Sequence, residues 1–206
     1  QEALERVSGL VADLKREGIQ ITTLDIGGGY GIVYNNETPF TPVQFANLIT
    51  PYLKQTGCRL IIEPGRFMVG NSAVLLTRVT YVKRTPTKTF YICDAGMNDL
   101  IRPAFYDSYH QITPVQVKEG TAKEVVDVVG PICESSDCFA KGREIETVQE
   151  GDLLAIMSAG AYGFAMSSNY NSRPRPCEVL VDGENFSVIR KRETYEDLIA
   201  GESISW

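Results

Sequence analysis

Two short apolar segments that each lead into a glycine-containing loop constrain the fold of this chain more than any other feature. Residues 19–26 are rich in β-branched side chains and run directly into three successive glycines at positions 27–29. Residues 59–62 are almost wholly apolar and end at Glu63. Short apolar strands of this kind are typical of a parallel sheet that is covered on both faces. The sequence therefore predicts consecutive βα units.

Helical patterns accompany both segments. Apolar residues at three- and four-residue spacing predict a helix over residues 4–14, and Gly18 supplies its C-terminal turn. A second helix is predicted after Thr41, because Thr41 and Gln44 form a capping-box pattern before an apolar face. Pro51 is expected to bend or shorten this helix. The order of helix, strand and glycine loop is that of an α/β fold.

The pattern changes at about residue 74, where short strand-like segments separated by turns replace the helices. Their spacing suggests a sandwich or barrel, so the chain is expected to divide into residues 1–73 and 74–206. Two parallel strands cannot cover a sheet alone, and the first part is expected to need further strands from upstream. The predicted strands cover residues 75–82, 89–93, 115–118, 124–129, 152–156, 177–181 and 186–190.

Composition narrows the classes of function. The 206 residues are 43% hydrophobic and 22% charged, as in a soluble globular protein, and no apolar run is long enough for a membrane helix. A formal net charge of −6 without a basic cluster predicts no nucleic-acid partner. Five cysteines, an odd number, favour a reducing compartment and a cytoplasmic protein. The single histidine argues against a zinc site and a hydrolase triad, so no metal is expected.

The loops after the two apolar strands have the chemistry of an anion site. Gly27, Gly28 and Gly29 allow backbone N–H groups to approach an anion, although a tight turn explains these glycines equally well. The Glu-Pro-Gly-Arg segment at 63–66 follows the next strand, and ligands of parallel α/β folds bind at the carboxyl ends of strands. Arg66 offers a planar fork for phosphate or carboxylate; a surface arginine after a turn is the competing interpretation.

Two polar, glycine-interrupted stretches, residues 94–106 and 130–137, follow predicted strands in the second part of the chain. Binding residues are commonly found on such loops. Each candidate also has a simpler interpretation. Arg102 is then a solvated charge, Tyr106 a half-buried core residue and Cys133 a small buried hydrophobe.

Five motifs, taken in order, resemble the C-terminal half of the diaminopimelate decarboxylase family. The resemblance implies a pyridoxal 5′-phosphate enzyme of the alanine-racemase-like type, with the C-terminal part of a (β/α)8 barrel followed by an antiparallel β-sandwich or barrel domain. The implied reaction converts meso-diaminopimelate to L-lysine and CO2 in a homodimer. Ornithine and arginine decarboxylases, which typically carry Cys-Asp at the position of Cys133 and Glu134, are the alternative. The motifs lie at residues 24–29, 63–66, 94–106, 130–135 and 160–163.

The resemblance also implies a role for each matching residue. Cys133 is the acid that protonates the carbanion left by CO2, and Cys133 and Glu134 reach into the partner subunit's site. The residues that would hold the cofactor are Gly27, Gly28, Gly29, Glu63, Gly65, Arg66 and Tyr162. Those that would bind the substrate are Arg66, Arg102, Tyr106, Glu134 and Tyr162.

The family's Schiff-base lysine does not match any lysine of this chain. Its Tyr-Ala-x-Lys-Ala-Asn type motif is expected upstream of residue 1, in an N-terminal half that this chain needs as a partner. The chain alone is therefore expected to be inactive, as a truncated product, one piece of a nicked enzyme or a complete domain. A non-catalytic binding or regulatory homologue is the alternative from a different class of function.

Overall fold

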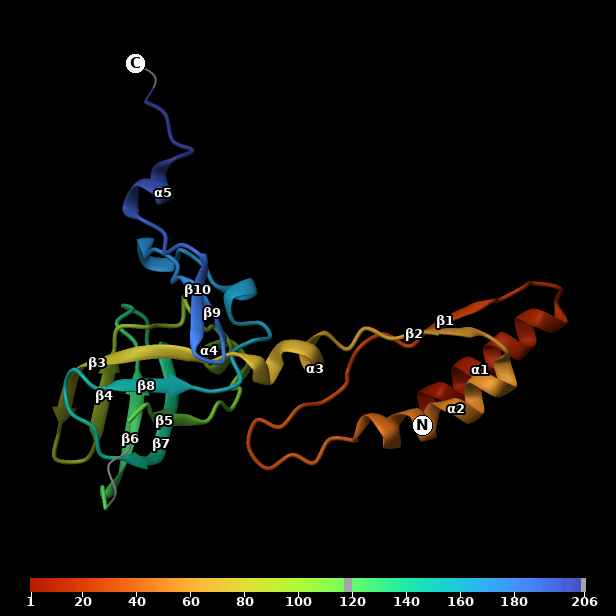
Figure 1. Cartoon of the computed structure of the whole chain (residues 1–206), viewed down its shortest axis with the longest axis horizontal. Helices are drawn as coiled ribbons and strands as arrows, with labels where there is room; N and C mark the ends of the chain where they lie inside the picture. The colour runs from red at the N-terminus through yellow and green to blue at the C-terminus, as the bar shows by residue number, and fades with distance from the viewer. Residues whose placement is uncertain (117–119, 205–206) are drawn as a thin grey trace. The chain divides into compact units, whose positions relative to one another are not determined.

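The structure, a computed structural model, describes residues 1–116 and 120–204 and divides into two units, Gln1–Asn71 and Ser72–Trp206 (Figure 1). The division lies two residues before the expected start of the second part at residue 74. The first unit is α/β and the second is built mainly from strands. Among the described residues, no helix combines the length and the apolarity that crossing a membrane requires.

The first unit contains two parallel strands joined through a helix. Strand β1 pairs with β2 so that Leu24 lies opposite Leu60, and helix α1 packs against helix α2. Val11, Leu24 and Cys58 form a small core between these elements. This arrangement confirms the predicted βα pattern. The elements are α1 (Glu2–Arg16), β1 (Thr23–Asp25), α2 (Pro42–Thr56), β2 (Arg59–Ile61), α3 (Gly65–Val69) and, at the junction of the units, the 3-10 turn η1 (Gly70–Ser72).

Helix α2 begins and ends as its sequence predicts. The Thr41 side chain accepts the N–H of Gln44 at 3.2 Å, and the Gln44 side chain accepts the N–H of Thr41 at 2.9 Å. Gly57 ends the helix at φ 63°, where a side chain would be strained. The helix continues past Pro51 to Thr56, so the expectation that Pro51 shortens it is wrong.

The second unit is organised around a six-stranded sheet in the order β5-β8-β3-β4-β6-β7. Its outer strands β5 and β7 also lie next to one another, so the sheet nearly closes into a barrel. β4 and β6 pair in parallel, with Tyr91 opposite Val128. The sheet is therefore mixed, and the expectation of a wholly antiparallel domain is wrong for this pair. Its strands are β3 (Leu75–Arg84), β4 (Thr89–Cys93), β5 (Ile112–Pro114), β6 (Lys123–Val129), β7 (Cys138–Glu146) and β8 (Leu153–Ile156).

Six of the seven predicted strands of the second unit match observed strands closely, and two regions differ. Of the predicted strand at 115–118, residues 115 and 116 form a bend after β5, and residues 117 and 118 lie outside the described residues. Strand β7 was not predicted, because Lys141, Gly142 and Arg143 interrupt its apolar alternation.

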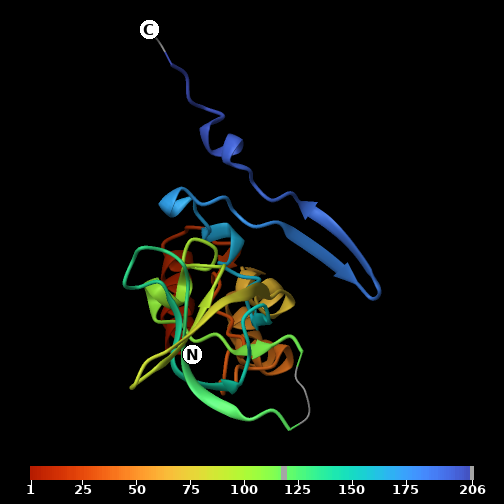
Figure 2. The ribbon, with the colours of Figure 1, turned by 90° about the vertical axis from the view of Figure 1, so that its left-hand side faces the viewer.

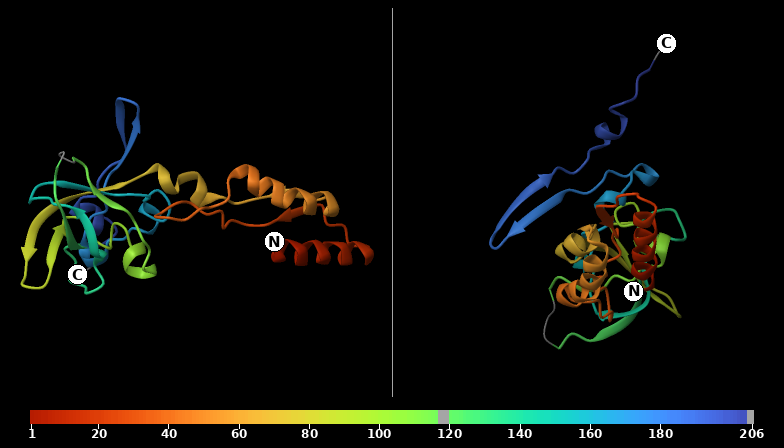
Figure 3. Two further views of the ribbon diagram at one scale, coloured as in Figure 1. Left: turned by 90° about the horizontal axis from the view of Figure 1, so that it is seen from below. Right: turned by 90° about the vertical axis from the view of Figure 1, so that its right-hand side faces the viewer.

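A hairpin and a short helix complete the second unit. Strands β9 (Glu178–Asp182) and β10 (Asn185–Arg190) pair antiparallel, and α5 spans Tyr195–Ile199. Apolar side chains of both strands, such as Leu180 and Phe186, are exposed. Figures 2 and 3 show the hairpin extending away from the six-stranded sheet of the same unit.

The centre of the six-stranded sheet holds a buried polar link. The hydroxyl of Tyr91, a fully buried residue, donates to Glu124 Oε1 at 2.7 Å and accepts the Val148 N–H at 3.2 Å. Burial raises the pKa of Tyr91 to about 12, so the hydroxyl stays protonated. The link ties β4, β6 and the segment after β7 together.

We expect Tyr91→Phe to lower the free energy of unfolding by about 1–3 kcal/mol, because the Val148 N–H loses its acceptor inside the protein. Urea unfolding of the full-length protein measures the change. Tyr81→Phe is the matched control, since the Tyr81 side chain on β3 is 54% exposed, and it should change the free energy by less than about 0.5 kcal/mol. Equal effects of the two substitutions would contradict the prediction.

Candidate functional site

Backbone hydrogen bonds join the two loops that follow β1 and β2. The Ile26 N–H donates to Ile61 O at 3.2 Å, and the Glu63 N–H donates to Gly27 O at 2.8 Å. Because β1 and β2 are parallel, both loops leave the sheet at its carboxyl edge. The glycine loop and the segment 63–66 are therefore brought together, as the sequence predicts.

The glycine loop approaches the second loop too closely for side chains. A Cβ on Gly28 would lie 2.7 Å from the backbone oxygen of Glu63. Gly27 and Gly29 have φ values of +68° and +83°, a region that favours glycine. The Gly27 N–H donates to Asp25 Oδ1 at 2.8 Å, which fixes the start of the loop.

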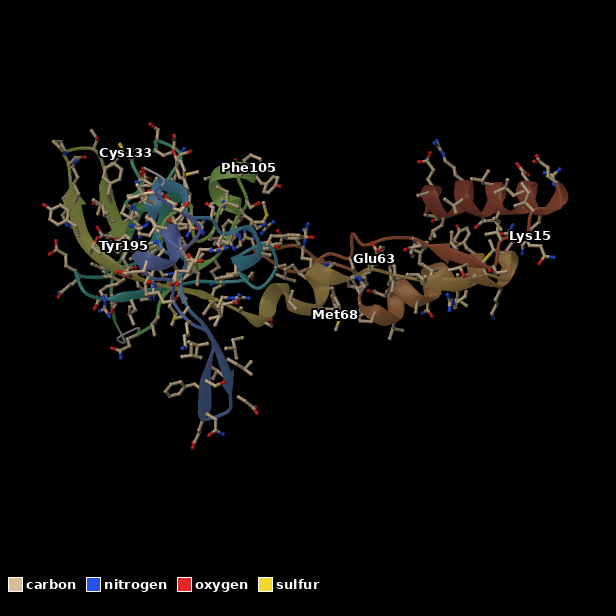
Figure 4. The ribbon with its side chains drawn as sticks, turned by 90° about the horizontal axis from the view of Figure 1, so that it is seen from above. Lys15, Glu63, Met68, Phe105, Cys133 and Tyr195 are labelled. Carbon is tan, nitrogen blue, oxygen red and sulfur yellow. The ribbon has the colours of Figure 1, made fainter. Side chains whose placement is uncertain are left out.

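The groups around this loop form a donor set for an anion. In the described part of the chain, the N–H groups of Gly28 and Gly29 have no protein acceptor. Arg66 is half-buried on α3, and Glu63, labelled in Figure 4, is exposed. Backbone N–H groups and a guanidinium suit a phosphate, and a carboxylate suits a protonated ring nitrogen. The donor set therefore fits pyridoxal phosphate.

We expect Gly28→Ala to weaken binding of pyridoxal phosphate about tenfold or more, because relieving the contact with Glu63 O displaces a loop at a cost of about 1–3 kcal/mol. Cofactor titration of the full-length protein measures the affinity. Gly9→Ala on helix α1 is the control, because no atom lies within 4 Å of its added Cβ. Unchanged cofactor affinity in Gly28→Ala would show that the close approach is unimportant.

In the second unit, Asp137 joins two loops that carry candidate site residues. Its Oδ1 accepts the Met97 N–H at 2.7 Å, and its Oδ2 accepts the Ile132 N–H at 2.6 Å. Asp137 is 4% exposed, and this burial raises the pKa of its carboxyl group, an effect that the two N–H donors oppose. The segment 130–137 is thereby fixed against the segment that leads into helix α4 (Arg102–Tyr106).

Two glycines make this approach possible. A Cβ on Gly130 would collide with the Asp137 carboxylate, and a Cβ on Gly96 would lie 2.8 Å from Ile132 Cγ1. Neither loop has room for a larger residue at these positions. The sequence singled out both loops but gave Asp137 no role, because its partner Met97 lies 40 residues away.

Cys133 and Glu134 lie at the exposed tip of the second of these loops. Cys133 is exposed, whereas Cys58 and Cys93 are buried, so the interpretation of Cys133 as a buried hydrophobe is wrong. Glu134 is exposed and its Oε1 accepts the Ser136 N–H at 3.4 Å. Figure 4 shows Cys133 at the margin of the second unit.

We expect Asp137→Asn to lower stability by about 1–3 kcal/mol and also to reduce turnover, because the amide keeps one oxygen acceptor but its NH2 cannot accept the second of the two N–H groups that the carboxylate binds. Thermal unfolding and steady-state kinetics of the full-length protein measure the two effects. Asp182→Asn, at an exposed position of β9, should leave both unchanged. An Asp137→Asn variant that matched the wild type in both stability and turnover would contradict the role of Asp137 in fixing the two loops.

Arg102 begins α4 (Arg102–Tyr106) and is only 7% exposed, so the interpretation as a solvated charge is wrong. Its Nη1 lies 3.1 Å from His110 Nε2, and its guanidinium carbon lies 5.9 Å from the centre of the Tyr162 ring.

Tyr106 is 57% exposed and packs edge-on against Phe105 with 4.7 Å between ring centres, so it is not a half-buried core residue.

Tyr162 has an unusual backbone conformation. Its φ is 59°, in the left-handed region that favours glycine, and its side chain is 44% exposed. It stands between the buried Ala161 and Gly163, and a Cβ on Gly163 would collide with the backbone oxygen of Ala159. The tight turn thus presents the tyrosine ring on the side of Arg102.

The structure therefore collects the candidate residues in groups within each unit. The first unit brings together the glycine loop and the segment 63–66. The second places Arg102 near Tyr162, and fixes the loop of Cys133 and Glu134 through Asp137. Sequence reasoning missed His110, the residue in contact with Arg102. The one sequence feature that points to His110 is that it is the single histidine of the chain and lies just before a strand.

The loops described above fit pyridoxal phosphate, and comparison with known proteins shows the family to which the chain belongs. The family described as pyridoxal-dependent decarboxylase, C-terminal sheet domain, matches residues 10–160, so the chain belongs to this family. Pyridoxal phosphate is the cofactor of the family, and it fits the donor set described above.

Individual relatives define the similarity further. The chain is 50% identical over 200 residues to diaminopimelate decarboxylase of Aquifex aeolicus, a match that covers 97% of this chain and 47% of that protein. The structure of diaminopimelate decarboxylase from M. jannaschii in complex with L-lysine superposes with a TM-score of 0.93 at 42% identity, covering 98% of this chain and 48% of that chain. A lysine/ornithine decarboxylase from Vibrio vulnificus in complex with cadaverine gives 0.73 at 25% identity, covering 82% and 46%. The chain spans about half the length of the relatives that it matches.

Proposed function

We propose that the full-length protein containing this chain converts meso-diaminopimelate to L-lysine and CO2 with pyridoxal phosphate as cofactor. The observation that carries the proposal is the 50% identity to a diaminopimelate decarboxylase over 97% of this chain. The buried Arg102 beside the exposed Tyr162 also supports it. Diaminopimelate has two amino-acid ends, and the carboxylate that is not lost as CO2 needs a cation to bind it.

On the cofactor side, the N–H groups of Gly28 and Gly29 bind the phosphate, and Gly27 shapes the turn. Gly65 and Arg66, at the start of α3, would contribute to the same site, and Glu63 would pair with the protonated ring nitrogen. Pyridoxal phosphate, when bound, accepts the electron pair that the departing CO2 leaves behind. Glu63 favours this by keeping the ring nitrogen protonated.

On the substrate side, Arg102 binds the distal carboxylate and Glu134 binds the distal ammonium group. Tyr106, Tyr162 and Arg66 complete the substrate contacts. The reaction breaks the bond between Cα and the carboxylate carbon, and the thiol of Cys133 gives its proton to that Cα. Water then returns a proton to the thiolate, so the residue is ready for the next turnover.

The same proposal extends to the assembly. The first unit forms the C-terminal part of a (β/α)8 barrel, and the second is a β-sandwich or barrel domain that follows it. The remaining half of the polypeptide supplies the Schiff-base lysine. Cys133 and Glu134 reach into the partner's site of a homodimer. A cytoplasmic location is supported by the five cysteines, all of which carry free thiols.

A decarboxylase of ornithine or arginine is the second candidate. The side chain of Glu134 is one methylene longer than the Asp of those enzymes, and Arg102 offers a charge for a carboxylate that ornithine lacks. The similarity to the lysine/ornithine decarboxylase is also much lower, at 25% identity. All three observations favour diaminopimelate.

We expect the full-length protein to release CO2 from meso-diaminopimelate in preference to ornithine and arginine. Cys133→Ser should fold normally and lose about 10²–10⁴-fold in turnover, because a serine hydroxyl is a much weaker acid than a thiol. Cys177→Ser, outside the proposed site, should retain full activity. A preference for ornithine would assign the chain to the other branch, and cofactor binding without turnover of any of these amino acids would support a non-catalytic homologue.

Mixed dimers test whether Cys133 acts across the subunit interface. Subunits with Cys133→Ser and subunits without the Schiff-base lysine are each expected to be inactive. Their mixture should recover part of the activity, because one hybrid site combines an intact lysine with an intact cysteine. Verified mixed dimers that remain inactive would exclude a shared site.

A further inference from the structure

His110, the single histidine of the chain, is fully buried beside the proposed substrate arginine. It lies in the chain between α4 and β5, and its ring faces α4 on one side and the segment that follows β8 on the other. Nε2 faces Arg102 Nη1 at 3.1 Å, and Nδ1 faces the backbone oxygen of Met157 at 2.8 Å. Both contacts are made by the imidazole ring and not by the backbone hydrogen bonds of a helix or strand. They therefore depend on this side chain being histidine.

These two partners fix the protonation state of the imidazole. A guanidinium can only donate, so Nε2 must accept; a carbonyl oxygen can only accept, so Nδ1 must carry the proton. The ring is therefore neutral, with its hydrogen on Nδ1. A protonated ring would lose the acceptor on Nε2 and place a second positive charge against Arg102.

The surroundings hold His110 in the neutral form. Burial lowers its pKa below the ordinary value, and the charges of Arg102 on α4 and Arg143 on β7 lower it further, although the bond to Met157 O opposes them. Arg143 donates to His110 O at 2.9 Å and stacks on Tyr109, with 4.0 Å from its guanidinium carbon to the ring centre. Among the described residues, the charged groups that act on the imidazole pKa are Arg102 and Arg143, and both are cationic.

We propose that His110 is a positioning residue that orients the Arg102 guanidinium toward the substrate carboxylate. Nε2 receives one N–H of the guanidinium, which restricts rotation of the fork. The Tyr162 ring lies 5.9 Å from the guanidinium carbon. The inference rests on the proposed function, since it assigns Arg102 a substrate carboxylate to bind.

Two ligands separate this role from a general structural one. L-lysine keeps the distal carboxylate of the substrate, whereas cadaverine is the same diamine without it. A residue that orients Arg102 therefore affects binding of lysine and leaves binding of cadaverine nearly unchanged. A residue that only supports the fold affects both ligands alike.

Matched variants of the full-length enzyme provide the test. His110→Asn keeps a donor for Met157 O but removes the acceptor that faces Arg102, whereas His110→Gln extends an acceptor oxygen toward the former position of Nε2. We expect His110→Asn to raise the KM for diaminopimelate and the inhibition constant of L-lysine about tenfold, with less than about threefold change in kcat or in cadaverine inhibition. His110→Gln should recover most of the lysine affinity. Equal losses for lysine and cadaverine, or wild-type lysine affinity in His110→Asn, would overturn the proposal.

The tautomer gives a readout that does not depend on activity or on how well the Asn variant folds. In wild-type enzyme with ¹⁵N-labelled histidine, the His110 resonances, assigned by their loss in His110→Gln, should show a neutral ring protonated on Nδ1. Protonation on Nε2 would overturn the inference. If the wild type fails to convert diaminopimelate, the proposed function fails, while the tautomer and the lysine and cadaverine affinities still decide the role of His110.

Discussion

The buried carboxylate of Asp137 is the constraint on which the loops of the second unit depend. Its oxygens accept N–H groups from residues 5 and 40 positions away, Ile132 and Met97. Hydrogen bonds to a charged group contribute about 1.5–3 kcal/mol each, which offsets the cost of burying a carboxylate whose pKa is raised. Without them, the loop of Cys133 would lose its two backbone hydrogen bonds to the Asp137 carboxylate, one of which reaches the segment that leads into Arg102.

Local sequence rules account for much of the structure. The capping box of Thr41 and Gln44 predicts where α2 begins, and the segment 89–93 is predicted as the strand that the structure contains. The glycine loop and the segment 63–66 are predicted to meet because both follow parallel strands. These features depend on neighbouring residues and on general topology, so one sequence is enough to predict them.

The features that were missed depend on contacts between distant parts of the chain. Strand β7 is stabilised by pairing with β6, which compensates for the glycine and the charges within it. The parallel pairing of β4 with β6 has no local signal either. The burial of Arg102 follows from its contact with His110, and the role of Asp137 follows from its bond to Met97. In each case the partner is visible only after the sheet has formed.

The backbone of Tyr162 shows where folding and function have opposed requirements. A side chain at φ 59° costs about 1–3 kcal/mol relative to glycine. Selection for stability alone would therefore favour glycine at this position. The tyrosine persists only while its ring is useful near the buried cation, so among homologues a change to glycine here would mark chains that gained stability after losing the ligand.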